Sequence, residues 1–339
     1  FKNISTYYLI FSIGILIIFL SKIINDHSSF SYYLKYIIIS TIMALVSLIS
    51  FKIKNKIKKI INIIIFSCIF SFYFFEFYIS YEQFNFNKKS KLSFLNDYKK
   101  TINEDVVTVI PPKEHLNANY NFFPLGGISN IETIYCNELG FYTVYKSDKY
   151  GFNNNASVWD NKEIDYVLIG DSFVHGACVE NKFNIANRIS EYSNRSVLNL
   201  GMAGNSFLIY YATLKEYINI NKTKRVLIFF TEDNDLEGLK FEAKDKKLKK
   251  YLNNNNYTQN LKKNQGEIDK ILFNVFKISL EKEITDAKKR KYNQLNNFLK
   301  LYNLRSLTFD KINKPKISQP NTYELFEDIL KKIKNYFKN

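Results

Sequence analysis

Three short polar segments in the middle of the chain carry residue types that suit acyl-group chemistry. A serine hydroxyl can attack an ester carbonyl, while backbone N–H groups and a side-chain amide can stabilise the oxyanion that forms. Ser172 could be the nucleophile, and its own N–H, the N–H of Gly204 and the carboxamide of Asn234 could be the oxyanion donors. Each segment alone also fits a helix cap or a turn. The three segments are Gly170–Phe173, Asn199–Asn205 and Thr231–Asp235.

Each polar segment directly follows an apolar run of the length of a buried strand. The alternation of strand and helix predicts a parallel sheet with right-handed crossovers, and hence a three-layer α/β/α sandwich. The carboxyl ends of such strands share one edge of the sheet, so we expect Ser172, Gly204 and Asn234 to meet there. The expected strands are Asp165–Gly170, Ser196–Gly201 and Arg225–Phe230, and the expected helices between them are 181–193 and the amphipathic Leu208–Ile220.

In order and spacing, the three polar segments resemble three of the four sequence blocks of the SGNH (GDSL) hydrolase superfamily, over Asp165–Asp235. The resemblance implies a flavodoxin-like SGNH fold in which Ser172 is the nucleophile and Ser172, Gly204 and Asn234 form the oxyanion hole. The superfamily includes esterases and O-acyltransferases, and these segments do not distinguish them. Glu232-Asp233 replaces the usual Gly-x before Asn234. The supporting residues that we expect around the site are Asp171, His175 and Asp235.

The fourth block of the superfamily, an Asp-x-x-His that supplies the general base, does not occur in this sequence. The three histidines are His27, His115 and His175. His175 follows Ser172 by three residues, which rarely lets a ring reach the serine oxygen, so we expect it on the helix surface or against substrate. We expect the missing block beyond residue 339. The alternative is a non-catalytic module that binds an envelope glycan or a partner.

The first eighty residues contain three apolar stretches of nearly the length that crosses a bilayer. Lys52–Lys59 carries five lysines, whereas Ser21–Tyr32 carries one. The positive-inside rule therefore predicts that Lys52–Lys59 and the N-terminus are cytoplasmic, and that everything after residue 81 is extracytoplasmic. The stretches YGFNN and TLKEY also resemble stretches of membrane-linked bacterial members of the superfamily. Together with this topology, the resemblance predicts a periplasmic domain anchored in the bacterial inner membrane. The stretches are Tyr7–Ile24, Tyr33–Phe51 and Ile60–Ile79.

We expect three parts of the chain: transmembrane helices over 1–81, a connector over 82–160, and the α/β domain over 161–339. Within the connector, Tyr145–Asn154 is typical of a turn that leads into the main domain. Residues 236–305 are typical of solvated helices and loops. Thr322–Phe337 has the apolar spacing of a helix.

The cysteines and the distribution of charge indicate which compartment and which kinds of partner to expect. Cys136 and Cys178 could form a disulfide in an oxidising compartment, or could be two buried thiols, and Cys68 lies in an apolar run. The net charge of +16 is spread along the chain without a basic stripe, so we expect no nucleic-acid partner. No motif calls for a metal or an organic cofactor. The expected partners are the lipid bilayer and an acylated glycan or lipid substrate.

Overall fold

The computed structural model describes residues 2–25, 30–86, 91–138, 140–309 and 320–337 and divides the chain into two compact units. A helical unit contains Phe1–Glu82 and Leu295–Asn313. An α/β unit contains Gln83–Gln294 and Lys314–Asn339. The expected connector, 82–160, therefore lies in one unit with most of the expected main domain from residue 83 onward. Residues 295–309 group with the helical unit.

The helical unit consists mainly of α1 (Lys2–Asn25), α2 (Phe30–Ser50) and α3 (Asn55–Phe86). Two of its segments, Ser5–Ile24 and Asn55–Tyr81, are long and apolar enough to cross a membrane, with mean hydropathies of 2.2 and 2.0. Only 6% of each apolar window is buried inside the protein, unlike a core helix of a soluble domain. The corresponding apolar part of α2, Tyr36–Ser50, is shorter than the roughly 20 residues of a typical span.

A buried carboxylate joins α3 to the short helix α11 (Tyr302–Phe309). Glu76 is fully buried and accepts hydrogen bonds from the backbone N–H groups of Asn303 at 3.0 Å and Leu304 at 2.8 Å. These N–H groups lie in the first turn of α11 and have no acceptor within the helix, so the carboxylate takes the place of a cap. This pairing explains why a segment near the end of the chain belongs to the helical unit.

The α/β unit is built on a three-stranded parallel sheet, as the alternation of strand and helix predicts. Its strands are β4 (Ile164–Ile169), β5 (Val197–Asn199) and β6 (Thr223–Ile228). The spatial order is β5-β4-β6, with Tyr166 opposite Val197 on one side and Arg225 on the other. The three expected strands are therefore confirmed, and their carboxyl ends share one edge.

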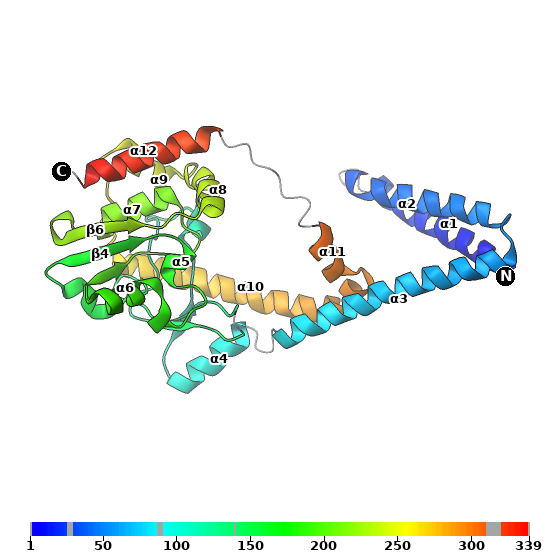
Figure 1. The fold of residues 1–339 in the computed structure, drawn as a ribbon, viewed down its shortest axis with the longest axis horizontal. Helices are drawn as coiled ribbons and strands as arrows, with labels where there is room; N and C mark the ends of the chain where they lie inside the picture. Colours follow the sequence, from blue (N-terminus) through cyan, green and yellow to red (C-terminus); the bar gives the residue numbers. More distant parts are fainter. Residues whose placement is uncertain (1, 26–29, 87–90, 139, 310–319, 338–339) are drawn as a thin grey trace. The chain divides into compact units, whose positions relative to one another are not determined.

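Helices pack on both faces of this sheet (Figure 1). Leu168 faces α6 (Ile185–Ser193), while Val167 and Ile169 face the core that contains α7 (Phe207–Tyr217) and α12 (Pro320–Tyr336). The amphipathic character expected of Leu208–Ile220 is wrong, because in α7 every residue except Lys215 is buried. Neighbouring helices cover its outer side. They are α8 (Glu232–Glu242), α9 (Lys246–Asn253) and α12, and the long α10 (Gln265–Leu299) contributes Ile268 and Leu272 to the same core.

A second small sheet, which the sequence pattern did not reveal, forms from residues of the expected connector. Parallel pairing joins β1 (Val106–Thr108) to β2 (Glu132–Ile134), and antiparallel pairing joins β2 to β3 (Val144–Lys146). Helix α4 (Lys91–Ile102) packs on it through Leu95. Each strand has only three residues, too few to show an alternating apolar pattern in the sequence.

The turn expected over Tyr145–Asn154 is held by a buried carboxylate. Asp148 accepts from the N–H groups of Tyr150 at 2.8 Å and Phe152 at 3.0 Å, and from the Asn154 amide at 2.8 Å. The Trp159 indole N–H donates to the same carboxylate at 2.7 Å. Burial raises the pKa of Asp148 and these four donors oppose that effect.

The same turn pairs with the outer edge of the large sheet through one side chain. The amide of Asn154 donates to the carbonyl of Asn199 at 2.8 Å, and its oxygen accepts from the N–H of Asn199 at 2.7 Å. A carboxamide therefore takes the place of a neighbouring strand beside β5. This pair of bonds attaches the turn to the strand that leads into the segment with Gly204.

We predict that Asn154→Ala lowers the free energy of unfolding by about 3 kcal/mol, because it leaves both backbone groups of Asn199 without partners. Thermal unfolding of the full chain, followed by circular dichroism, measures the loss. The exposed Asn256→Ala serves as the matched control and should change stability by less than about 0.5 kcal/mol. Equal midpoints for the two variants would contradict the strand-like role of Asn154.

Candidate functional site

An open cavity of about 540 Å³ lies where the three predicted segments meet at the carboxyl edge of the sheet. Ser172, Gly204 and Asn234 all line it, so the structure brings together the three residues that the sequence singled out. Asp171 and the two half-cystines also lie in its wall. The remaining lining residues are Lys113, Tyr135, Glu138, Ala177, Ala203, Asn205, Glu237, Gly238 and Phe241.

Ser172 occupies the first position of the short helix α5 (Ser172–His175), directly after β4. Asp171 caps this helix, since its Oδ1 accepts from the N–H of Phe173 at 3.0 Å. The N–H of Ser172 is one of the first-turn N–H groups that α5 itself leaves unpaired. The side chain of Ser172 is half-buried, so its hydroxyl is shielded and still reachable from the cavity.

Position 204 requires a glycine for two reasons, its backbone conformation and the closeness of the Lys113 side chain. Its φ of +71° is in the left-handed region that disfavours side chains. A Cβ at this position would lie 2.5 Å from Cδ and 2.8 Å from Nζ of Lys113. The glycine therefore leaves room for the lysine side chain next to the segment that we expect to donate to an oxyanion. Lys113 was not singled out from the sequence, because it lies far upstream in the expected connector.

Asn234 lies in the first turn of α8 and not in a loop after the third strand. Thr231 is the N-cap, and the backbone N–H of Asn234 donates to the Thr231 carbonyl at 3.1 Å. This backbone donor is therefore occupied, and the exposed carboxamide is the part of Asn234 that can donate into the cavity. The helix begins at Glu232, so the polar segment Thr231–Asp235 forms the N-cap and first turn of α8.

Asp235, the residue after Asn234, holds the first turn of α8 in place through hydrogen bonds. Its buried carboxylate accepts from the N–H of Thr231 at 2.8 Å and from the hydroxyl of Tyr210 on α7 at 3.0 Å. The hydroxyl of Ser206 donates to the backbone carbonyl of Asp235. Burial raises the pKa of Asp235 to about 6, and the two hydrogen bonds act in the opposite direction. These contacts fix α8 against the segment that carries Gly204.

A second buried carboxylate, which the sequence analysis missed, ties the same two elements together. Glu242 on α8 accepts from the N–H groups of Ser206 at 2.7 Å, Leu208 at 3.0 Å and Ile209 at 3.1 Å. These are the unpaired donors at the start of α7, where a negative charge is favoured by the helix dipole. Burial nevertheless raises the pKa of Glu242 to about 8. No sequence signal marks this residue, because it lies more than thirty residues from its partners.

His175 is fully buried, so the expectation of a helix-surface or substrate-contacting residue is wrong. Its Nδ1 accepts from the backbone N–H of Ala203 at 3.2 Å, and its Nε2 lies 2.8 Å from the hydroxyl of Tyr145. A backbone N–H can only donate, so Nδ1 carries a lone pair and Nε2 carries the hydrogen. Burial lowers the pKa of His175 to about 3. The ring therefore stays neutral and positions Ala203, next to Gly204.

The other histidines lie elsewhere. His115 is buried in edge-on contact with the rings of Tyr120 and Phe123, and burial lowers its pKa to about 4. His27 lies outside the described residues. Among the histidines that the structure describes, none lines the cavity. Within the same residues, no group of three or more His, Cys, Asp or Glu side chains could hold a metal ion.

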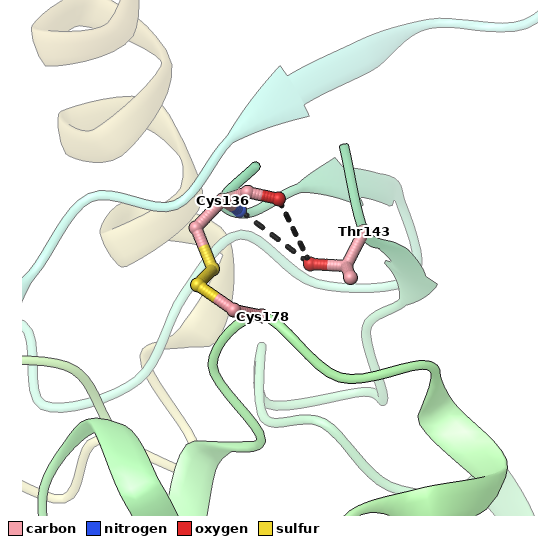
Figure 2. Close-up of a disulfide and its surroundings, with 3 residues drawn as sticks. All are labelled: Cys136, Thr143 and Cys178. Carbon is pink, nitrogen blue, oxygen red and sulfur yellow. Dashed lines mark hydrogen bonds between the residues drawn. A yellow bond between two sulfur atoms is a disulfide. The ribbon is translucent and has the colours of Figure 1, made fainter. Parts of the chain in front are cut away.

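A disulfide forms part of the cavity wall. Cys136 and Cys178 are joined, with their Cα atoms 5.2 Å apart (Figure 2). The hydroxyl of Thr143 donates to the Cys136 carbonyl at 3.3 Å and fixes the end of the small sheet. The bond links the β2–β3 hairpin to the segment that follows α5. It therefore connects the connector residues to the wall beside Ser172. Cys68 is free and exposed on α3.

Comparison with known proteins gives no relative for this chain. No family model, no curated protein and no solved structure matches it.

We predict that protonation of Glu242 contributes to stability below neutral pH. Its pKa in the folded protein, about 8, exceeds its usual value of 4.5, so the folded state binds the proton more tightly than the unfolded chain. This contribution is complete below pH 4.5 and is lost as the pH rises through 8. Unfolding midpoints of the wild type should therefore fall between pH 5 and pH 8, and those of Glu242→Gln should fall less.

Glu237→Gln, an exposed carboxyl on the same helix, is the control for this titration and should keep the wild-type slope. If Glu242→Gln lost stability with pH as steeply as the wild type, the assignment would be wrong.

Proposed function

We propose that this protein is a membrane-anchored serine hydrolase of the SGNH type, acting on ester bonds of an acylated envelope glycan or lipid. The observation that carries the proposal is that Ser172, Gly204 and Asn234 line one cavity at the carboxyl edge of a parallel sheet. The proposed fold is the three-layer flavodoxin-like sandwich of that superfamily. The helices on both faces of the sheet are consistent with it.

In the proposed reaction the Ser172 oxygen forms a bond to the ester carbonyl carbon, and its proton passes to a general base. The N–H groups of Ser172 and Gly204 and the amide of Asn234 stabilise the oxyanion. The intermediate collapses to an acyl-serine, and the alcohol leaves with the proton from the base. Water or a sugar hydroxyl then takes the acyl group, which makes the protein an esterase or an O-acyltransferase respectively. The resemblance assigns the base to an Asp-x-x-His block.

The proposed location is the outer face of a bacterial inner membrane, with the N-terminus in the cytoplasm. The two apolar helices α1 and α3 and the lysines of Lys52–Lys59 support this topology. The Cys136–Cys178 disulfide supports it independently, because such bonds persist in oxidising compartments. Both observations favour an α/β unit exposed to the cell envelope.

A specific observation favours a second candidate function, a non-catalytic module that binds an envelope glycan. Both ring nitrogens of His175 are engaged by Ala203 and Tyr145, and no described histidine lines the cavity. Without a base, a serine hydroxyl is a weak nucleophile at neutral pH. The cavity would then serve recognition alone.

We predict that hydrolysis of p-nitrophenyl acetate by this protein depends on Ser172, so that Ser172→Ala reduces the rate to background. Asn234→Ala should lower kcat by about 10²–10³-fold, because one oxyanion donor is lost. Ser157→Ala, an exposed serine outside the cavity, is the matched control and should keep the wild-type rate. Covalent labelling of Ser172 by a fluorophosphonate, located by peptide mass spectrometry, is an independent readout. Equal rates for wild type and Ser172→Ala would rule out the serine mechanism.

A further inference from the structure

A groove of about 310 Å³ runs between α1, α2 and α3 in the helical unit. Most of its lining is apolar and open, and Phe11, Ile42 and Val46 are each more than half exposed. The hydroxyls of Ser12 and Ser47 donate to carbonyls of their own helices, at 2.7 Å and 2.8 Å, so they do not donate to a ligand. The groove therefore offers a mainly apolar surface.

The polar groups that α3 brings to the groove lie at one end of it. Lys58 and Asn62 are one turn apart on one face of the helix, close to its start at Asn55. Ile65 and Ile69 continue the same face into the apolar part of the groove. From Lys58 to Ile69 the face extends about 16 Å along the helix, about half of a hydrocarbon core of roughly 30 Å. The groove thus has the depth of one leaflet and is polar at only one end.

Lys58 differs from the other lysines of Lys52–Lys59. It is 7% exposed, whereas the other four are exposed. Its stem is covered, but its amine nitrogen is not fully enclosed. Within the described residues the amine has no hydrogen-bond or ion-pair partner, and it lies 6.0 Å from the centroid of the Phe51 ring. A cation held in this way is costly unless a negative charge pairs with it.

The helices around the groove do not supply that negative charge. Residues 27–75, which contain all of α2 and the larger part of α3, include no Asp or Glu. Glu76 lies about 27 Å further along α3 from Lys58, and its carboxylate is engaged by α11. The one other carboxylate of the first eighty residues, Asp26, lies outside the described residues. An anionic ligand would satisfy Lys58.

The groove also indicates which kind of anion it fits. A lysine amine and a carboxamide N–H together suit a phosphate, which accepts hydrogen bonds and carries negative charge. The isoleucines beyond them suit an acyl chain, because its burial removes apolar surface from the polar end of the membrane. The four exposed lysines of Lys52–Lys59 add to the positive potential at this end and disfavour a headgroup that carries an amine.

We propose that Lys58 and Asn62 bind the phosphate of an anionic phospholipid, one acyl chain of which lies in the groove between α1, α2 and α3. The proposed topology places this end of the helices in the cytoplasmic leaflet. The site lies in the helical unit and depends neither on Ser172 nor on any hydrolysis. It makes one lipid a specific partner of the anchor, whereas the remaining lipids act only as its solvent.

The test compares two lipids on the full chain in a non-ionic detergent. Dioleoylphosphatidylglycerol and dioleoylphosphatidylcholine are titrated separately, and bound lipid is counted by native mass spectrometry. We expect the wild type to bind the phosphatidylglycerol about tenfold more tightly, which corresponds to about 1.4 kcal/mol. Lys58→Gln should abolish this preference, and Lys58→Arg should retain it. Lys59→Gln, the same loss of charge at the adjacent exposed lysine, is the matched control and should retain the preference.

A second pair of variants tests the apolar part of the groove. Ile65→Trp fills the groove and should weaken both lipids about tenfold, without removing a headgroup contact. Ile63→Trp, at an exposed position outside the groove lining, is its control and should bind both lipids as the wild type does. Phosphatidylglycerol should also raise the thermal midpoint of the wild type and of Lys59→Gln, but not that of Lys58→Gln.

Four outcomes would overturn the inference. Equal affinities of the wild type for the two lipids would exclude recognition of the headgroup. Equal losses in Lys58→Gln and Lys59→Gln would indicate general attraction to a basic surface. Displacement of the lipid by millimolar inorganic phosphate would show that the acyl chain contributes nothing. A lower midpoint of lipid-free Lys58→Gln would assign Lys58 a structural role instead.

Discussion

The site depends on the carboxylate of Glu242 at the start of α7. Three backbone N–H groups from the segment after Gly204 converge on one side chain of α8, the helix that carries Asn234. The positions of Gly204 and Asn234 relative to one another are therefore set by three hydrogen bonds to one buried side chain and not by the sheet alone. The hydrogen bond between Tyr210 and Asp235 is a second connection between α7 and α8. Ser172 reaches the same point through β4, the central strand.

The parallel sheet and the meeting of the three candidate residues could be predicted from the sequence, because both follow from local patterns. Apolar runs predict strands, and parallel strands direct their following segments to one edge. The orientation of Asn234 could not be predicted, since it depends on whether α8 begins at Glu232. That boundary is set by Asp235, whose partners include Tyr210 on a different helix.

The contribution of residues 91–160 to the site could not be predicted for a different reason. The strands in this region have three residues each. The cavity residues from this region include Lys113, Tyr135 and Cys136, and all three lie in segments outside these strands. Their positions depend on contacts of long sequence separation, such as the Asn154–Asn199 pair and the disulfide. The burial of His175 has the same origin, because its pocket is made by the rings of Tyr135 and Tyr145.

The carboxamide of Asn154 also affects how this protein meets other molecules. An open sheet edge can recruit a strand from another chain and so start aggregation. On the β5 side, the side chain of Asn154 occupies the backbone groups of Asn199 that an incoming strand would need. On the β6 side, Arg225 is exposed, whereas Lys224 is paired with Glu163 at 2.7 Å and with Asp165 at 3.1 Å. The backbone groups of Asn199 are thus unavailable to a strand from a neighbouring copy.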